Sequence, residues 1–189
     1  GKPENIMTQE NPWADFVADA IKNNMDSDIV LINSANFRGS VDNGKVTERD
    51  ISSIFPFNNN LAKVKLSEKA IVDAIKQCGK SIPAKNHKPG LLQVSGLKYT
   101  LDSQGELKEM KFVDKSGEEH EINVNNPDEN KKYTVLYDKF LMEGGDELSM
   151  LVPKEGDIIE TYDFDKDKVT SDYIRTLPQP FSVNTDGRI

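Results

Sequence analysis

The sequence predicts an α+β fold, with a mixed β-sheet core that contains hairpins and is flanked by helices. Segments with the spacing of amphipathic helices and segments with the spacing of strands both occur. Several strands in the middle of the chain are separated only by short turns. This order favours hairpins over strict strand–helix–strand units, and therefore an α+β fold over a doubly wound one. A length of 189 residues with 36% hydrophobic content is enough for a single domain over residues 1–189.

The first predicted elements are a helix and a buried strand. Residues 10–25 predict a helix, because Asn11 can cap it, Pro12 suits the first helical position, and apolar residues follow at helical spacing. Ile29 to Ile32 form a short apolar run that is typical of a buried strand. Asp42-Asn43-Gly44 predicts a turn further along the chain.

Two capped helices are predicted next. Thr47, with Asp50 three residues later, resembles a capping box, and the short helix that it starts stops before Pro56. Residues 61–79 first alternate between two faces and then take a helical spacing after Ser67, which can cap a helix. This stretch therefore predicts a strand followed directly by a helix.

The second half of the chain is predicted to consist mainly of strands. Serine, glutamine and glycine turns separate three of them, which indicates a β-meander. The predicted segments are a lysine-rich loop broken by proline over residues 80–90, meander strands around 91–102, 106–114 and 119–124, one more strand from Tyr133 to Tyr137, and a last helix over 168–177.

Charge, cysteine content and hydropathy exclude several classes of partner and of structure. Lys and Arg number 24 against 32 Asp and Glu, a net charge of −8, which argues against nucleic acid or anionic membranes as main partners. The single cysteine, Cys78, excludes an intramolecular disulfide framework. No apolar run approaches the ~20 residues that span a bilayer. The opening residues, GKPENIMTQE, are more typical of a domain boundary than of a natural start.

Metal chemistry finds little support in the residue pattern. His87 and His120 stand in charged, loop-like surroundings without ligand spacing, and we interpret them as solvated surface residues. Residues 163–168, DFDKDK, imitate the start of a calcium loop. Lys168, however, stands where that loop needs glycine, and Ile174 where it needs glutamate. We interpret this segment as a polar turn and expect no metal ligand on this chain.

Other reactive motifs are also missing from the sequence. No glycine-rich phosphate loop and no nucleophile elbow occur. Cys78 ends a predicted helix with no histidine near it in sequence, so a small buried residue is the simpler interpretation. Lys80, Lys85, His87 and Lys88 could meet a phosphate, although charge runs in loops are mostly solvated.

Three loop tips combine residues that suit a flat polar ring. Aromatic faces can stack on such a ring, an amide can read its edge, and a carboxylate can bind paired hydroxyls. The phenylalanines among them could equally be ordinary core residues. The tips are NSANFRG with Asn33 and Arg38, FPFNNN with Phe57, Asn58 and Asn59, and FLMEGGD with Phe140, Gly145 and Asp146.

Taken in order, these motifs resemble the C-terminal domain of the 5′-nucleotidase family, which includes UDP-sugar hydrolases and 2′,3′-cyclic-nucleotide phosphodiesterases. The resemblance covers nearly all 189 residues. It is carried by the segments NSANFR, FPFNNN, LQVSGL at Leu92 to Leu97, FLMEGGD, and the final DGRI. The sequence departs from the family pattern at Gln9, where arginine is usual, and at Ala14 and Asn58, where glycine is usual.

The resemblance implies a role for each residue of the three tips. Phe57 and Phe140 would stack on the two faces of a nucleobase, with a contribution of ~1–3 kcal/mol per base. The other implied roles are a hydrogen bond from Asn33 to the base or ribose, Asn59 near the base, Asp146 accepting from the ribose hydroxyls, Arg38 facing the ribose-phosphate side, and Gly145 allowing close approach of the backbone.

The resemblance also implies where catalysis takes place. In the family, two divalent metal ions belong to a separate N-terminal calcineurin-like phosphoesterase domain, which this chain lacks. The chain would bind the nucleotide substrate and set specificity, without catalytic residues or bound cofactor of its own and without activity alone. The implied setting is nucleotide catabolism by a hydrolase outside the cytoplasm, secreted, periplasmic or at the cell surface. The alternative is a non-catalytic nucleoside-binding or interaction module that keeps the fold.

Overall fold

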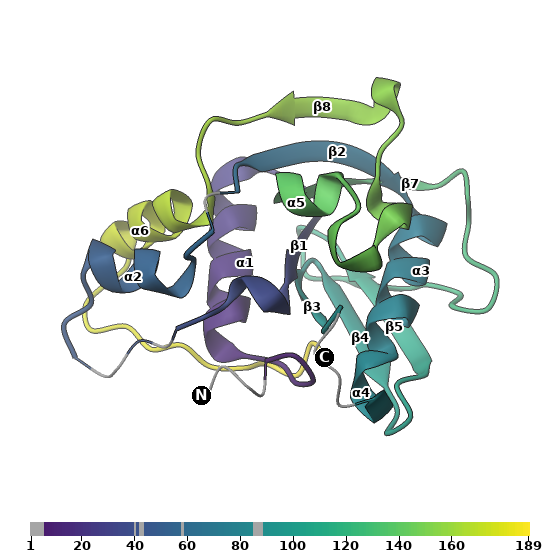
Figure 1. Cartoon of the computed structure of the whole chain (residues 1–189), viewed down its shortest axis with the longest axis horizontal. Helices are drawn as coiled ribbons and strands as arrows, with labels where there is room; N and C mark the ends of the chain where they lie inside the picture. The colour runs from purple at the N-terminus through teal and green to yellow at the C-terminus, as the bar shows by residue number, and fades with distance from the viewer. Residues whose placement is uncertain (1–5, 40, 42–43, 58, 85–88) are drawn as a thin grey trace.

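A computed structural model describes residues 6–39, 41, 44–57, 59–84 and 89–189 (Figure 1). None of the helices formed by these residues is long and apolar enough to cross a membrane. The helices are α1 (Pro12–Met25), α2 (Glu48–Ile54), α3 (Glu68–Gly79), α4 (Ser81–Ala84), α5 (Lys139–Met142) and α6 (Lys166–Thr176), with short 3-10 helices η2 (Ser34–Asn36), η3 (Gly145–Glu147), η4 (Ser149–Leu151) and η5 (Glu155–Asp157). The strands are β1 (Ile29–Asn33), β2 (Leu61–Ser67), β3 (Leu92–Ser95), β4 (Leu97–Leu101), β5 (Leu107–Val113), β6 (Glu119–Glu121), β7 (Lys132–Asp138) and β8 (Ile158–Thr161).

The strands in the described part of the chain form two sheets. Both faces of the larger, central sheet pack against a hydrophobic core. Five strands pair in the order β3-β1-β7-β2-β8, and three pair in the order β4-β5-β6. Ile29 and Leu31 of β1 pack into the core that contains α3 and the three-stranded sheet, whereas Val30 and Ile32 pack into the core that contains α1 and α2. Figure 1 shows α1, α2 and α6 on one side of the molecule and α3, β4 and β5 on the other. The predicted α+β class is confirmed.

Local capping signals explain where the main helices begin. The side chain of Asn11 accepts hydrogen bonds from backbone N–H groups in the first turn of α1, as predicted. Thr47 and Asp50 form both bonds of a capping box at the start of α2. The Ser67 hydroxyl accepts from the backbone N–H of Ala70 at 3.1 Å, where β2 passes directly into α3. These predicted elements are confirmed.

The predicted β-meander is only partly right. β4, β5 and β6 form one, but β3 leaves it and pairs antiparallel with β1 in the central sheet. The reason is burial, because all four residues of β3 are buried, whereas β4 alternates between buried and more exposed positions. The chain turns between the two sheets at Gly96, where φ is 78° and a Cβ would stand 2.1 Å from the Asp28 carbonyl oxygen.

Three further segments either differ from the predictions or lie partly outside the described residues. The expected loop over residues 80–90 contains the one-turn helix α4, while Lys85, His87 and Lys88 lie outside the described residues. Asp42 and Asn43 of the expected turn lie outside them as well. Strand β8 was not predicted, because its four residues are all exposed and lack the alternation that marks a half-buried strand.

The topology brings three loop tips to one edge of the central sheet. β1 runs parallel to β7, so their carboxyl ends point the same way. β2 runs antiparallel to β7, with Leu61 opposite Asp138, so the segment that leads into β2 reaches the same edge. The backbone N–H of Lys139 donates to the Asn60 carbonyl at 2.8 Å and joins two of these segments directly. Crevices beyond the carboxyl ends of strands are common places for ligands.

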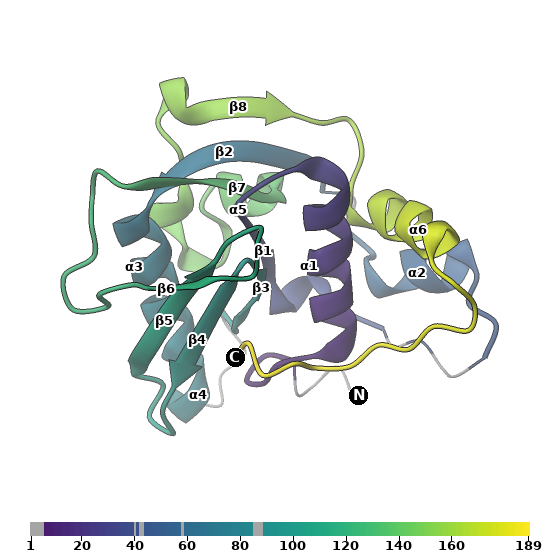
Figure 2. The same ribbon diagram turned by 180° about the vertical axis from the view of Figure 1, so that it is seen from behind.

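The C-terminal segment, residues 177–189, closes the opposite side of the fold. Figure 2 shows it crossing below α1 toward the three-stranded sheet. The carboxylate of Glu10 accepts the backbone N–H groups of Asp186, Gly187 and Arg188 at 3.1, 3.0 and 3.2 Å. The Arg188 guanidinium, which is 8% exposed, donates to Asp19 at 2.8 and 3.0 Å.

Candidate functional site

A pocket of about 500 Å³ opens at the sheet edge where the three loop tips meet. This volume lies within the range of small-molecule sites, about 300–1,000 Å³. Six of the seven predicted site residues line it. The lining consists of Asn33, Ala35, Asn36 and Arg38 after β1, Pro56, Phe57 and Asn59 before β2, and Phe140 and Asp146 after β7.

Of the remaining predicted positions, one lies beside this lining and one lies outside the described residues. Gly145 lies against the ring of Phe140, because a Cβ built on it would come within 2.5 Å of the ring carbons. Asn58 lies outside the described residues. Ala35, Asn36 and Pro56 were not predicted, although they fall within the motifs NSANFR and FPFNNN that were.

Two phenylalanine rings form exposed apolar walls of the pocket. Phe57 is 46% exposed and Phe140 is 37% exposed, so neither is the ordinary core residue that the sequence also allowed. The Arg38 guanidinium lies over the Phe57 ring, with its central carbon 5.6 Å from the ring centre. A large exposed ring costs hydration free energy unless a ligand covers it, which makes these two rings candidates for stacking.

The polar part of the pocket joins β1 to the loop after β7. The Asn33 amide donates to the Asp146 carboxylate, with 2.9 Å between Nδ2 and Oδ2. Asn33 is only 1% exposed, and its Oδ1 has no hydrogen-bond partner among the described residues. Most buried amide oxygens are paired, so this unpaired acceptor is an exception at the wall of the pocket.

The loop that carries Asp146 has an unusual backbone. Gly144 has φ of 81°, and it is followed by Asp146 and Glu147 with φ of 56° and 64°. Side chains rarely take this left-handed conformation, although aspartate tolerates it better than most. Strain of this kind persists where the surroundings fix it, and it is frequent at binding sites.

Cys78 is a buried neighbour of this region without reactivity of its own. Burial raises the pKa of the Cys78 thiol above its usual range, and the charge of Asp146 raises it further. The thiol therefore stays protonated at neutral pH and is a poor nucleophile. The interpretation of Cys78 as a small buried residue is confirmed, since it is 1% exposed.

The two clusters of potential metal ligands found among the described residues lie away from the pocket. Asp114, Glu118 and His120 gather on a turn, where the His120 ring is 2.8 Å from Asp114. Glu10, Asp15 and Asp186 gather where the C-terminal segment meets α1. None of these six residues lines the pocket, and His87 lies outside the described residues.

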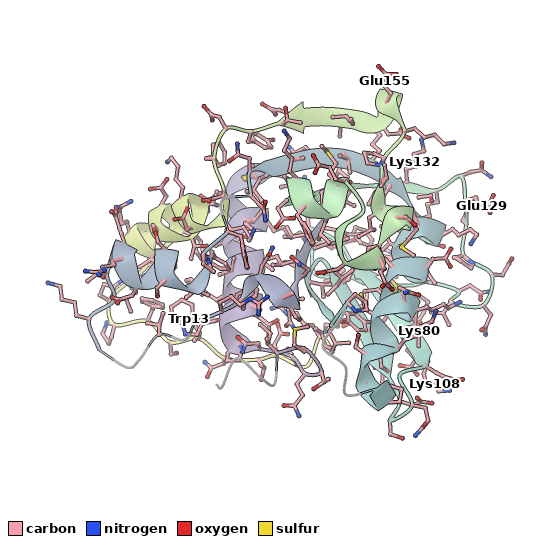
Figure 3. All side chains as sticks on the ribbon, in the orientation of Figure 1. Trp13, Lys80, Lys108, Glu129, Lys132 and Glu155 are labelled. Atoms are coloured by element: carbon pink, nitrogen blue, oxygen red, sulfur yellow. The ribbon has the colours of Figure 1, made fainter. Side chains whose placement is uncertain are left out.

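Neither Lys80 of the predicted lysine-rich loop nor the predicted polar turn over residues 163–168 lines the pocket. Lys80 is exposed and donates to the Gln77 side chain at 2.7 Å, and Figure 3 places it at the end of the molecule near Lys108. The DFDKDK segment is not only a turn, because α6 begins inside it at Lys166. Lys166 is 2% exposed and its ammonium contacts Asp138 at 2.8 Å, so it belongs to the interior.

Comparison with known proteins connects this pocket to one family. Residues 3–153 match the family described as "5′-nucleotidase, C-terminal domain". Over its full length the chain is 24% identical to the trifunctional nucleotide phosphoesterase protein YfkN of Bacillus subtilis, of which it covers 13%. Over 98% of its length it is 27% identical to Protein 5NUC of Lutzomyia longipalpis, of which it covers 33%.

A solved structure has the same fold over almost the whole chain. The 5′-nucleotidase precursor from Thermus thermophilus matches 99% of this chain with a TM-score of 0.82, at 22% sequence identity. The chain covers 36% of that protein. It therefore spans between 13% and 36% of the length of these three relatives.

Proposed function

Because this chain belongs to the 5′-nucleotidase C-terminal domain family, we propose that it is the substrate-binding and specificity domain of a nucleotide phosphohydrolase. The observation that carries the proposal is the pair of exposed rings, Phe57 and Phe140, that line one pocket from two different loops. A nucleobase is flat and has two π faces, so two aromatic walls are suited to it.

The polar groups of the pocket fit the rest of a nucleoside. Asp146 can only accept hydrogen bonds when ionised, which suits the paired hydroxyls of ribose better than a phosphate. Its bond to Asn33 holds the carboxylate in place. The Asn33 oxygen is buried and unpaired in the unliganded protein, and it would accept from the base or ribose once a small side-chain shift exposes it. Asn59 lines the same pocket beside Phe57 and would lie near the base.

The side of the pocket that carries Arg38 is the one we assign to the phosphate. Arg38 is exposed, positively charged and already in contact with the Phe57 ring, so a base stacked there would direct its ribose-phosphate toward the guanidinium. Gln9, which stands where the family usually has arginine, is exposed and does not line the pocket. Phosphate contacts in this chain would therefore depend mainly on Arg38.

Hydrolysis is assigned to a part of the polypeptide beyond these residues. The relatives are much longer than this chain, which leaves room for an N-terminal calcineurin-like phosphoesterase domain with two divalent metal ions. When bound there, such a metal pair clamps a phosphate and supplies a hydroxide nucleophile. The present residues would orient the nucleotide toward that centre and set which base is accepted. On this proposal residues 1–189 form one domain that binds substrate but is inactive alone.

Family membership also suggests where the protein acts. One matching structure is described as a precursor, which is consistent with export and processing. We propose nucleotide catabolism outside the cytoplasm, whether secreted, periplasmic or at the cell surface. Fractionation of cells that express the full-length protein, with detection of the protein in each fraction, tests this location.

Titration calorimetry with adenosine and AMP tests the function. The full-length protein is expected to bind both, and Phe57→Ala or Phe140→Ala should weaken adenosine binding by about 5- to 150-fold, the equivalent of losing one stacked ring. Phe181→Ala is the matched control, because that ring stacks on Phe16 near α1, outside the pocket.

Two outcomes would reject the proposal. They are no binding to the metal-loaded full-length protein, and unchanged binding in both pocket variants. The gene sequence upstream of Gly1 separates the enzyme from a non-catalytic binding module that keeps the fold. An enzyme should encode Asp-x-His and Gly-Asn-His-Glu metal motifs there, and a module should not.

A further inference from the structure

A buried lysine lies behind the pocket without lining it. Lys166 is the first residue of α6 and is 2% exposed, as is Asp138, to which its ammonium donates at 2.8 Å. The same ammonium lies 5.7 Å from the centre of the Phe55 ring. Lysine is almost never this buried unless it is paired, because removing the charge from water is costly.

Asp138 connects this lysine to two parts of the pocket. Its Oδ1 accepts the backbone N–H of Leu141 at 3.0 Å and so caps α5, the short helix that carries Phe140. Its Oδ2 accepts both Lys166 and the side-chain amide of Asn36, which lines the pocket, the latter at 2.5 Å. One buried carboxylate thus holds the Phe140 helix and the loop after β1.

The contact between Lys166 and Phe55 reaches the other aromatic wall. Phe55 precedes Phe57 by two residues and packs edge-on against Phe37, with ring centres 5.0 Å apart. The neighbouring Arg38 donates its backbone N–H to the Ile54 carbonyl at 3.0 Å. Lys166 is therefore connected to both aromatic walls. Its contact with Asp138 leads to Phe140, and its contact with Phe55 leads to Phe57.

Stability alone is a weak reason for such a pair. A buried ion pair is often no more stabilising than apolar residues of the same volume, because both charges lose their hydration. What the pair does offer is fixed geometry, since the carboxylate accepts three hydrogen bonds and the ammonium is held between that carboxylate and the Phe55 ring. A ring stacked on both faces needs about 3.5–4.0 Å of contact distance on each side, so the spacing of the walls has little tolerance.

We propose that Lys166 and Asp138 are positioning residues that set the spacing between Phe57 and Phe140. This inference rests on the proposed function for its ligand, a nucleoside, but the geometric claim concerns the unliganded protein. Neither residue lies among those that line the pocket, so both would act through Phe55, Asn36 and the capped α5.

Affinity is the first test, carried out on the full-length protein. Lys166→Met keeps the side-chain length without the charge, and Lys168→Met, two residues along α6, is the matched control because Lys168 is exposed and paired with Asp172. Lys166→Met should weaken adenosine binding at least about fivefold, since a stacked aromatic ring contributes about 5- to 150-fold to affinity and misplacing the rings loses part of it. The control should bind adenosine as the wild type does.

A double variant separates positioning from general destabilisation. Lys166→Met alone leaves Asp138 as an unpaired buried charge, whereas Lys166→Met with Asp138→Asn is neutral and keeps an oxygen that can cap α5. The double variant should regain much of the lost thermal stability and still bind adenosine at least about fivefold more weakly. Recovery of affinity together with stability would overturn the inference.

A measurement without ligand decides the geometric claim by itself. With fluorine-labelled phenylalanine, assigned by Phe57→Leu and Phe140→Leu, both resonances should shift in the double variant and neither in Lys168→Met. Two unshifted resonances, or a shift of only one, would contradict the proposal that Lys166 and Asp138 set the spacing between the two rings. If the wild type fails to bind adenosine the proposed function is wrong, and the fluorine spectra still decide whether Lys166 and Asp138 position the rings.

Discussion

Gly145 shows how one missing side chain shapes the pocket. Its φ is not in the left-handed region, so the backbone itself would accept alanine there. The obstacle is the Phe140 ring, whose carbons stand 2.5 to 2.6 Å from the position of an added Cβ. The ring is seated directly on the glycine backbone, which defines how far Phe140 extends into the pocket.

Gly145→Ala should therefore displace the Phe140 ring and weaken nucleoside binding by about fivefold or more, with little loss of stability because the ring is already 37% exposed. Calorimetry measures the affinity and thermal unfolding the stability. Gly156→Ala is the control, since nothing lies within 4 Å of its added Cβ. Equal affinities in the two variants would show that the contact between Gly145 and Phe140 is unimportant.

Asp15 is the second residue whose surroundings predict a measurable effect. It is 1% exposed, and neither carboxyl oxygen has a hydrogen-bond partner among the described residues. Burial raises the pKa of Asp15 to about 8, and the neighbouring carboxylate of Glu10 raises it as well. The other charged groups that face it are Asp186, whose carboxylate lies within 4.8 Å, and Arg188 at 3.7 Å, which partly offsets the effect.

The raised pKa of Asp15 makes folding depend on pH. Between about pH 4 and pH 8 the folded state keeps a proton that the unfolded state has lost, so the free energy of unfolding falls as pH rises. Asp15→Asn, which is neutral throughout, should be more stable than the wild type at pH 8 by at least about 1 kcal/mol, and should show a flatter profile. Urea unfolding at pH 5, 6.5 and 8 measures this.

Asp172→Asn is the control for that profile, because Asp172 lies on the surface of α6 and pairs with Lys168. Its stability should follow the pH dependence of the wild type. A profile of Asp15→Asn that matches the wild type would mean that Asp15 is ionised in the folded protein.

Residue identity predicted most of the pocket lining but not the buried residues that lie behind it. Asn33, Phe57 and Asp146 were predicted because aromatic, amide and carboxylate groups together suit a flat polar ring with paired hydroxyls, and because the motifs resemble one family. Lys166 was not, because in sequence it stands in a charged run that is typical of a solvated turn. Only the topology, which brings Asp138 at the end of β7 against α6, shows that this lysine is buried.

At the scale of elements, the short helix α2 matters because it leads into Phe55 and Phe57. Its capping box consists of the Thr47 hydroxyl accepting from the Asp50 backbone N–H and the Asp50 carboxylate accepting from the Thr47 N–H. A seven-residue helix has little stability of its own, so the cap contributes a large share of it.

Thr47→Ala should lower the free energy of unfolding by about 1 kcal/mol, because an orphan N–H in the first turn loses its acceptor. Chemical denaturation measures the loss, and Ser53→Ala in the same helix is the control. Ser53 is exposed and its hydroxyl bonds back to the Asp50 carbonyl, so its removal should change stability little. Similar losses in both variants would argue against a specific role of the cap.

Elements with local signals were predicted well, and elements defined by long-range pairing were not. α1, α2 and α3 carry caps and helical spacing, which act within a few residues. β3 was grouped with its sequence neighbours, yet its full burial places it beside β1, some sixty residues away. β8 is recognisable only through its pairing with β2, because none of its side chains is buried.

At the scale of the whole molecule, nucleoside binding and phosphate hydrolysis should depend on different parts of the polypeptide. Residues 1–189 are expected to bind adenosine and to release no phosphate from AMP, because the metal centre is proposed to lie elsewhere in the polypeptide. A phosphate-release assay compares this chain with the full-length protein, each with added divalent metal and again after chelation. Metal-dependent phosphate release by the chain alone would contradict the assignment, and release by the full-length protein should disappear on chelation.

The bonds between Glu10 and residues 186–188 have a consequence for synthesis on the ribosome. Glu10 emerges 176 residues before Asp186, the first of the three residues whose N–H groups its carboxylate accepts. The Asn11 cap can start α1 locally, but the contact between Glu10 and residues 186–188 forms late, because closing so long a loop carries an entropic cost that local contacts do not. Nascent chains that stall before Asp186 would therefore carry an untethered Glu10 just before α1.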